Sequence, residues 1–307
     1  MSGRVCLITG ATSGIGKAAA AELARRGAHI VLVGRNASRC KAVADEIRAS
    51  TDKLNIEYFT ADLSSQAQVR CLAQEVLARH SQLHVLINNA GAIFALRQES
   101  VDKIEMTLAL NHLSSFLLTN LLLDALRNGS PARIINVSSS AHDDISAFNF
   151  DDPHARTSGY PTTESKSLLY TLLKPWAHPA FIQYAHSKLA NILFTRELAR
   201  RLQGTGVTVN AMHPGLVATS FTSGNGVFGW FMRRWMSLFG ISPDQGANTI
   251  VYLACSPQVA GVTGEYFVKE KIAPSSQASA DTVAARRLWE LCERLTQLPS
   301  VSLQTII

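Results

Sequence analysis

The chain has 307 residues, of which 47% are hydrophobic and 17% charged, a composition that can bury a large core and argues against intrinsic disorder. The net charge is +6, but the basic residues are scattered without a basic tail, so we expect no nucleic-acid partner. The five cysteines are odd in number and none are paired at metal-ligand spacing, which favours a reducing compartment and predicts no metal site. With no signal peptide before the first apolar run and no apolar run of roughly 18 residues, we expect a cytoplasmic protein.

The first half of the chain alternates short apolar runs with longer segments of helical periodicity. The runs predict strands at 4–9, 29–33, 55–60, 83–87 and 132–138, and the periodic segments predict helices at 14–27, 37–50, 65–80 and 102–128. Strands that alternate with helices form right-handed βαβ units. We therefore predict an α/β fold of the Rossmann type, with a doubly wound parallel sheet and helices on both of its faces.

The second half continues this pattern. It predicts, in order, a helix at 182–203, a strand at 206–212, a helix at 244–255, a last strand at 264–268 and a C-terminal helix at 282–297. Two segments break the rhythm, an insertion around 142–180 and an aromatic-rich segment at 219–242. Because no internal repeat or linker divides the chain, residues 1–307 are predicted to form a single domain.

A glycine-rich loop follows the first predicted strand and leads directly into a helix. Glycines let the backbone approach a pyrophosphate, and the helix N-terminus offers free N–H groups to it. The predicted cofactor contacts in this loop are Gly10, Thr12, Ser13, Gly14, Ile15 and Gly16. The spacing is G-x-x-x-G-x-G, which an ordinary strand-to-helix turn can also have.

The second predicted strand ends at Gly34-Arg35, and Arg35 lies 19 residues after Gly16. An acidic residue near this position would bind the ribose hydroxyls of NAD, whereas a guanidinium can bind a 2′-phosphate through two hydrogen bonds. Arg35 therefore favours NADP(H) over NAD(H), although a solvated surface arginine is the alternative.

Further cofactor contacts are predicted where the third and fourth strands end. Asp62, followed by Leu63, could accept a hydrogen bond from the adenine amino group or could serve as a turn or helix-capping residue. Around Asn88, Ala90 and Gly91, small residues would let the backbone lie close to a ligand at the carboxyl edge of the sheet.

Tyr184 and Lys188 are four residues apart on a predicted helix, so their side chains share one face. A free tyrosine has a pKa of about 10, and a neighbouring ammonium favours the phenolate and makes acid/base work feasible. An exposed Tyr/Lys pair is the alternative. Ser139, just after the fifth strand, could bond a substrate oxygen or simply be polar. Asn111, among apolar neighbours, could serve a water or proton relay or be a satisfied structural amide.

Taken together and in this order, the glycine loop, Asn88 to Gly91, Tyr184 with Lys188, and Pro214-Gly215 resemble the short-chain dehydrogenase/reductase family from about residue 4 to 297. The resemblance implies a proton-handling set of Asn111, Ser139, Tyr184 and Lys188, with Ser139 chosen because the family's serine is typically the second of the pair. It implies that Lys188 binds the nicotinamide ribose and that Asn111 holds a water. It also implies cofactor contacts at Tyr184, Lys188, Pro214, Gly215, Val217 and Thr219.

A closer resemblance is to the retinol-dehydrogenase-like branch. It rests on Asn111-His112-Leu113, Ala141-His142 after the serines, Ser187 to Asn191, His213-Pro214-Gly215 and Leu288 to Leu291. The stretch from Ser139 to Tyr184 is longer than is usual in the family. The light-dependent protochlorophyllide reductases are also similar and carry an insertion there, but they have a cysteine where this chain has Leu216.

The resemblance implies an NADP-dependent enzyme that interconverts an alcohol and a carbonyl on a bulky apolar substrate, such as a retinoid, steroid or lipid aldehyde. One alternative is an enzyme that reduces a C=C bond, as the protochlorophyllide reductases do. Another is a non-catalytic dinucleotide sensor or scaffold, which would tolerate loss of Tyr184 or Lys188. A homo-oligomer is plausible by resemblance, through helices in the 102–128 and 182–203 regions.

The aromatic side chains of the segment at 219–242 should pack against another surface, because a soluble monomer rarely exposes so much apolar area. We expect a substrate lid in which Trp230 and Phe231 contact the substrate. Arg233-Arg234 permits a rival, in which the segment dips into an anionic membrane. An ordinary helix packed on the core or on a subunit partner is the third reading.

Overall fold

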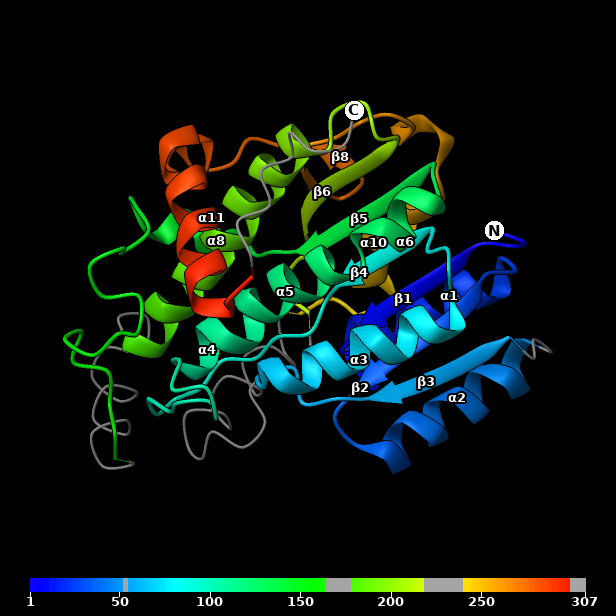
Figure 1. Ribbon diagram of the computed structural model, residues 1–307, viewed down its shortest axis with the longest axis horizontal. Coiled ribbons are helices and arrows are strands. Elements are labelled where there is room, and N and C mark those ends of the chain that lie inside the picture. The colour runs from blue at the N-terminus through cyan, green and yellow to red at the C-terminus, as the bar shows by residue number, and fades with distance from the viewer. Residues whose placement is uncertain (52–54, 164–177, 218–239, 299–307) are drawn as a thin grey trace.

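The computed structural model describes residues 1–51, 55–163, 178–217 and 240–298. They form one eight-stranded sheet in the order β3-β2-β1-β4-β5-β6-β7-β8 (Figure 1). The strands are β1 (Val5–Thr9), β2 (His29–Gly34), β3 (Ile56–Thr60), β4 (Val85–Asn88), β5 (Ala132–Val137), β6 (Val207–His213), β7 (Tyr266–Val268) and β8 (Lys271–Ile272). All neighbouring pairs are parallel except β7 and β8. This confirms the predicted Rossmann-type fold.

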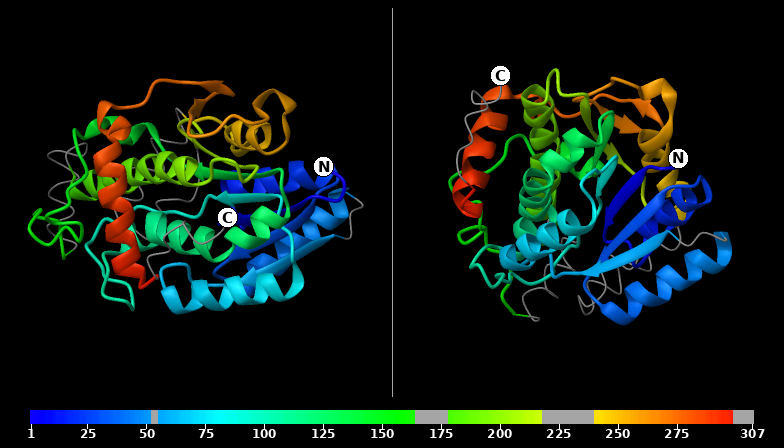
Figure 2. Two further views of the ribbon diagram at one scale, coloured as in Figure 1. Left: turned by 45° about the horizontal axis from the view of Figure 1, so that its top comes forward. Right: turned by 45° about the vertical axis from the view of Figure 1, so that its right-hand side comes forward.

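Helices cover both faces of the sheet (Figures 1 and 2). One face carries α1 (Gly14–Arg25), α2 (Ala37–Thr51) and α10 (Pro243–Cys255), and the other carries α3 (Gln66–Arg79), α5 (Ser114–Leu121) and α8 (Pro179–Arg201). The C-terminal helix α11 (Thr282–Thr296) packs against α8. None of the described helices is both long and apolar enough to span a membrane.

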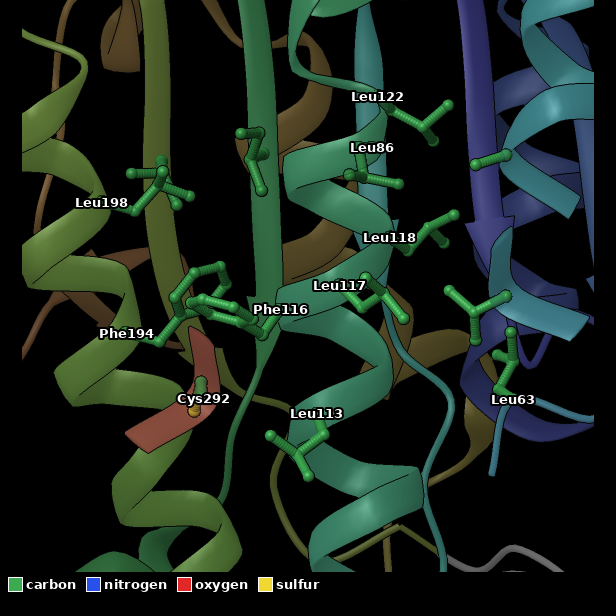
Figure 3. Packing of buried hydrophobic residues seen from close by; sticks show 14 of the residues in the cluster. Leu63, Leu86, Leu113, Phe116, Leu117, Leu118, Leu122, Phe194, Leu198 and Cys292 are labelled. Carbon is green, nitrogen blue, oxygen red and sulfur yellow. The ribbon is translucent and has the colours of Figure 1, made fainter. Parts of the chain in front are cut away.

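The strands are apolar on both sides because each separates two hydrophobic cores. In β1, Leu7 faces the core under α3, α5 and α8, whereas Cys6 and Ile8 face the core under α1, α2 and α10. On the first side, Phe116 of α5 and Phe194 of α8 have ring centroids 5.5 Å apart, with α11 closing over them (Figure 3). Residues of α11 belong to the same buried cluster, so this helix is part of the main core. Burying one large apolar side chain contributes about 1.5–3 kcal/mol to the free energy of folding.

The helix predicted over 102–128 is broken into four parts, and that prediction was wrong in detail. It consists of α4 (Met106–Leu108), a π-helical turn (Ala109–Leu113), α5 and α6 (Leu123–Asn128). The Glu105 carboxylate accepts from the N–H groups of Thr107 and Leu108 and so fixes the start at Met106. Hydrophobic periodicity does not register a π turn, which inserts one residue into a helix that otherwise stays apolar.

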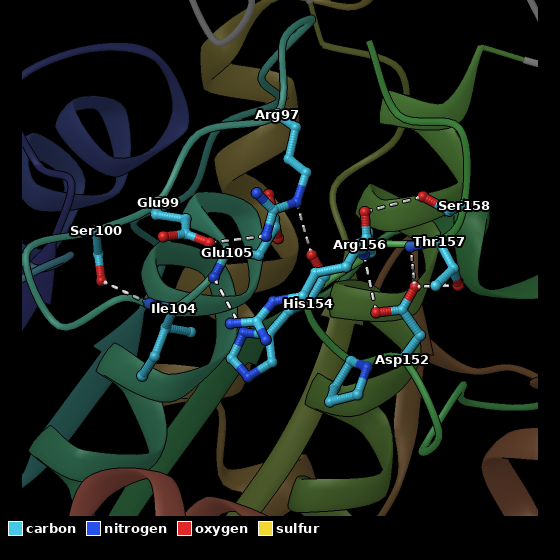
Figure 4. Close-up of polar contacts among 12 residues, drawn as sticks. Arg97, Glu99, Ser100, Ile104, Glu105, Asp152, His154, Arg156, Thr157 and Ser158 are labelled. Atoms are coloured by element: carbon cyan, nitrogen blue, oxygen red, sulfur yellow. Dashed lines mark hydrogen bonds and ion pairs between the residues drawn. The ribbon is translucent and has the colours of Figure 1, made fainter. Parts of the chain in front are cut away.

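The described part of the predicted insertion leaves β5 through a 3-10 turn at Ser140–Asp144 and forms an ordered loop (Figure 4). Asp152 accepts from the N–H groups of Arg156 and Thr157 at 2.8 and 2.7 Å. The Arg97 Nε donates to the His154 carbonyl at 3.1 Å, which ties this loop to the segment after β4. These contacts hold the loop against the segment that follows β4.

Candidate active site

A cleft of about 1280 Å³ opens at the carboxyl ends of the parallel strands. This is the edge of an open α/β sheet at which ligands bind. Sixteen of the predicted site residues line it: Gly10, Thr12, Ser13, Gly14, Ile15, Arg35, Asp62, Leu63, Ala90, Gly91, Ser139, Tyr184, Lys188, Pro214, Gly215 and Val217. Thr219, Trp230 and Phe231 lie outside the described residues.

The glycine loop fits a pyrophosphate. Gly10 and Gly14 have φ angles of +65° and +55°, which side chains disfavour. A Cβ on Gly10 would lie 2.9 Å from the Cα of Ala90, so the backbone of this loop packs directly on the end of β4. The N-cap residue Ser13 makes no capping hydrogen bond, which leaves the first N–H groups of α1 available to an anion.

Gly16 was predicted to contact the cofactor but does not line the cleft. A Cβ there would lie 2.5 Å from the Asn89 Nδ2 and 2.6 Å from the Gly10 carbonyl, so glycine is required for packing. Asn89, which the sequence analysis did not single out, donates from Nδ2 to the carbonyls of Thr9 and Gly10 at 2.8 and 3.2 Å. It therefore holds the glycine loop in place.

Asn88 also does not line the cleft, which corrects its prediction as a cofactor contact. Its Nδ2 donates to the Thr119 hydroxyl at 2.9 Å and to the Asn136 Oδ1 at 2.8 Å, between β4, β5 and α5. Side chains alternate along a strand, and this alternation turns Asn88 into the interior. It bridges the elements beneath the cleft rather than the ligand above them.

Two guanidinium groups border the far end of the cleft. Arg35 follows β2, and Arg39, which the sequence analysis missed, lies one turn later in α2; both are exposed and line the cleft. Within the described ranges, neither guanidinium forms an ion pair or a hydrogen bond, so both are available to an anion. Between them and the glycine loop, a Cβ on Gly34 would lie 2.5 Å from the Thr12 Cγ2, so this end of β2 packs tightly on the loop.

Asp62 has the turn role that was one of its two predicted readings. Its Oδ1 accepts from the N–H and the hydroxyl of Ser64 at 3.0 and 2.7 Å. The same residue lines the cleft beside Leu63, so the turn presents it to the cleft. The two readings are therefore compatible.

Tyr184 and Lys188 lie on one face of α8, with the Lys188 Nζ 5.4 Å from the centroid of the Tyr184 ring. Burial raises the pKa of Tyr184 to about 12, and a hydrogen bond with Ser139 opposes part of that rise. Burial also lowers the pKa of Lys188 to about 8. We expected the lysine to lower the pKa of the tyrosine, but that pKa is raised, because burial disfavours the charged phenolate.

Lys188 and Asn111 are fixed by backbone contacts behind Tyr184. The Lys188 Nζ donates to the Val137 carbonyl at 3.0 Å. The Asn111 side chain accepts from the Ala92 N–H at 2.8 Å and donates to the Ala92 carbonyl at 2.9 Å and the Ser187 hydroxyl at 3.1 Å. Asn111 does not line the cleft, and its amide is the satisfied structural group that was one of its two readings.

Two histidines hold the peptide group that joins Ser139 to Ser140. The fully buried His142 has its Nδ1 2.7 Å from the Ser139 carbonyl, and its Nε2 accepts from the Ser276 N–H at 3.1 Å. The Asp143 Oδ1 also lies 3.3 Å from this Nε2, but the Ser276 N–H points at the nitrogen and makes it an acceptor, so Nδ1 carries the proton.

The second histidine, His213, accepts at Nδ1 from the Ser140 N–H at 3.3 Å. Burial is the largest cause that lowers the pKa of His213 to about 4, which keeps that nitrogen an acceptor near neutral pH. Both histidines stood in the motifs that resemble the retinol-dehydrogenase-like branch. The contact of His213 with Ser140 and that of His142 with Ser276 join distant parts of the chain and carry no signal in the sequence.

The wall of the cleft around Tyr184 is apolar. Ile93, Phe181 and Leu216 belong to one cluster with Tyr184, and Ile145 and Ile182 also line the cleft. The phenol therefore borders an apolar part of the cleft wall.

The chain is similar to known dehydrogenases over nearly its whole length. The short chain dehydrogenase family matches residues 4–149, and the enoyl-(acyl carrier protein) reductase family matches residues 171–270. Retinol dehydrogenase 13 of Homo sapiens is 39% identical over 98% of this chain and 87% of its own. Retinol dehydrogenase 12 of Mus musculus is 39% identical over 95% of this chain and 86% of its own.

Two solved structures share the fold. An uncharacterised protein from Mycobacterium paratuberculosis is 30% identical, with a TM-score of 0.73 over 96% of this chain and 94% of its own. A protein from Beutenbergia cavernae described as an NAD(P)-dependent gluconate 5-dehydrogenase, with bound NADP, is 27% identical, with a TM-score of 0.65 over 88% of this chain and 96% of its own. With the Tyr184, Lys188 and Ser139 geometry, these similarities show that the chain belongs to the short-chain dehydrogenase/reductase family, in its retinol-dehydrogenase-like branch.

Proposed function

We propose that this protein is an NADP(H)-dependent oxidoreductase that interconverts an alcohol and a carbonyl on a bulky apolar substrate. The observation that carries the proposal is the layout of one cleft. It has free guanidinium groups at one end, an uncapped helix N-terminus in the middle, and a tyrosine with a serine and a lysine at the other end. This order matches the 2′-phosphate, the pyrophosphate and the nicotinamide of the cofactor.

The residues of the cleft hold such a cofactor by complementary charge. The N–H groups at the start of α1 would bind the pyrophosphate, and Arg35 with Arg39 would bind the 2′-phosphate. The nicotinamide, when bound, supplies or accepts the hydride. The Beutenbergia cavernae relative holds NADP, which supports this choice of cofactor.

The chain's own residues handle the proton. In carbonyl reduction, the neutral Tyr184 phenol donates its proton to the substrate oxygen, and Ser139 holds that oxygen with a hydrogen bond. The Lys188 ammonium lies near the ring and stabilises the phenolate that is left. Burial disfavours the phenolate in the free protein, which suits Tyr184 to act as an acid.

A substrate and cofactor panel tests this proposal. We expect oxidation of NADPH, followed by its absorbance, with a long apolar aldehyde such as retinaldehyde, and a much slower reaction with NADH. Short polar aldehydes should react poorly, because the wall around Tyr184 is apolar. Binding of NADPH without turnover on any aldehyde would instead support a dinucleotide sensor.

His142 is expected to set the position of Ser139 without touching the substrate. His142→Leu removes the donor to the Ser139 carbonyl, and the loss of that bond should lower kcat by about tenfold or more. His142→Asn places an amide N–H near the former Nδ1 and should restore most of the activity. Steady-state kinetics check this, with the KM for NADPH and the Tm as readouts of intact folding. Equal activity of the two variants would rule out a positioning role.

The lid at 219–242 stays a proposal from the sequence. The chain just before this segment lies by the cleft, since Leu216 and Val217 line it. At the other end of the segment, Ile241 donates its N–H to the Leu216 carbonyl at 2.8 Å. We expect the double variant Trp230→Ala, Phe231→Ala to lower kcat/KM for retinaldehyde by about tenfold, and that for a short aldehyde much less. Equal losses would make the segment structural. A loss confined to vesicle-bound substrate would instead favour the membrane-contact reading.

A further inference from the structure

Three side chains from separate segments converge at the end of the sheet opposite the cleft. They are His29 at the start of β2, Glu57 in β3 and His80 at the end of α3. The His29 Nε2 lies 2.8 Å and the His80 Nε2 2.5 Å from the same Glu57 Oε1. One ligand atom from each residue lies within 4.8 Å of the other two, which is a spacing that one small ion can bridge.

The backbone fixes this convergence. Val31 of β2 pairs with Glu57 of β3, so His29, two residues earlier, lies diagonally across from Glu57 on the same face of the sheet. His80 leaves α3 in an extended conformation while its N–H still bonds the Val76 carbonyl, which holds the residue at the helix end. The two imidazole rings meet edge to face with centroids 5.1 Å apart.

The exposure of the cluster suits an ion that arrives from solvent. The side chains of His29, Glu57 and His80 are 31%, 19% and 11% exposed, so they are ordered by packing and still reachable. The second carboxylate oxygen, Oε2, lies 3.3 Å from the Arg79 Nη1. A guanidinium behind a ligating carboxylate orients it, as partners of metal ligands do, although its charge also moderates the affinity.

We propose that His29, Glu57 and His80 form a binding site for a zinc-type divalent cation. Two imidazole nitrogens and one carboxylate oxygen are a donor set that Zn²⁺ takes, with water in the fourth position. The ligands would replace their present hydrogen bonds with bonds of about 2.0–2.2 Å to the ion, which needs only small side-chain rotations. The bound ion would link the β2–β3 edge of the sheet to the end of α3, far from the cleft.

The site is tested by titrating the purified, chelator-treated protein with Zn²⁺ in a calorimeter and with Co²⁺ in a spectrophotometer. All proteins carry Cys71→Ser, because the exposed Cys71 thiol could bind zinc by itself. We expect one equivalent of Zn²⁺ to bind, a higher Tm with Zn²⁺ present, and the intense visible absorption of tetrahedral cobalt.

Single substitutions then assign the ligands. His29→Gln, Glu57→Gln and His80→Gln should each weaken zinc binding by about tenfold or more, the loss of one charge-assisted contact. The matched control is His154→Gln, a partly exposed histidine outside the cluster, which should bind zinc like the parent. Turnover should be unchanged in all four, which separates this site from the catalytic cleft. Absence of saturable zinc binding, or undiminished binding by both histidine variants, would overturn the proposal and leave the cluster a set of ion pairs.

Discussion

Tyr184→Phe is expected to lower kcat for aldehyde reduction by about 10²–10⁴-fold, the usual contribution of a positioned general acid. The substitution removes only the phenolic oxygen, and the ring keeps its packing against the buried cluster that contains Ile93 and Ala180. NADPH should therefore bind nearly as in the parent protein. Steady-state kinetics measure the loss of turnover, and a fluorescence titration measures the binding.

The matched control is Tyr252→Phe. Tyr252 lies on α10, and its hydroxyl bonds the Gln258 side chain at 3.2 Å, away from the cleft. We expect this variant to keep full activity. If Tyr184→Phe kept activity within a factor of a few, Tyr184 would not be the acid, and the proposed proton pathway would fail with it.

Arg35→Ala is expected to weaken NADPH binding by about one to two decades while NADH binding barely changes. A charge-assisted hydrogen bond to a phosphate contributes roughly 1.5–3 kcal/mol, and only NADPH carries the 2′-phosphate. Arg39→Ala should act in the same direction, and the double variant should lose most of the preference between the two cofactors. Dissociation constants for both cofactors measure the effect.

Arg25→Ala is the control for general loss of positive charge, because Arg25 ends α1 and pairs with Glu22. It should leave both cofactors unaffected. An equal loss of NADPH and NADH affinity in Arg35→Ala would show that Arg35 supports the fold of the loop rather than reading the 2′-phosphate.

The architecture could be predicted because it depends on local patterns. Runs such as Ile30 to Val33 are apolar without alternation, which only strands covered on both faces require. The break in the helix after Glu105 could not be predicted, because the cap and the π turn at Asn111 leave the hydrophobic pattern unchanged. The two-residue strand β8 is too short to show any period.

The part of the site that could be predicted is the part in which the relevant residues lie on one helix or strand. Tyr184 and Lys188 share a face because they are four residues apart on one helix. Arg35 precedes α2 and Arg39 lies within it, so this rule does not connect them and Arg39 was missed. Asn88 is the last residue of β4, and whether its side chain faces the cleft or the interior depends on the alternation of side chains along that strand. The role of His142 depends on Ser139 and on Ser276, which is 134 residues away.

The electrostatics of the site needed the structure most of all. The spacing of Tyr184 and Lys188 says that an ammonium can approach a phenol, but the pKa of each depends on how deeply both are buried. Burial favours the neutral form of both side chains: it raises the pKa of Tyr184 to about 12 and lowers the pKa of Lys188 to about 8. A sequence carries no measure of that depth, so the raised pKa of Tyr184 and the lowered pKa of Lys188 could be found only from the folded chain.

The most direct measurement is the fate of deuterium from NADPH deuterated at both C4 positions of the nicotinamide. The protein is incubated with this cofactor and retinaldehyde, and the alcohol product is analysed by mass spectrometry, with Tyr184→Phe as the blank. We predict that each alcohol molecule carries one deuterium on the former carbonyl carbon and that product formation matches the NADPH consumed. An unlabelled alcohol, or NADPH binding with no product, would contradict the proposal that this cleft transfers a hydride between NADP(H) and a carbonyl.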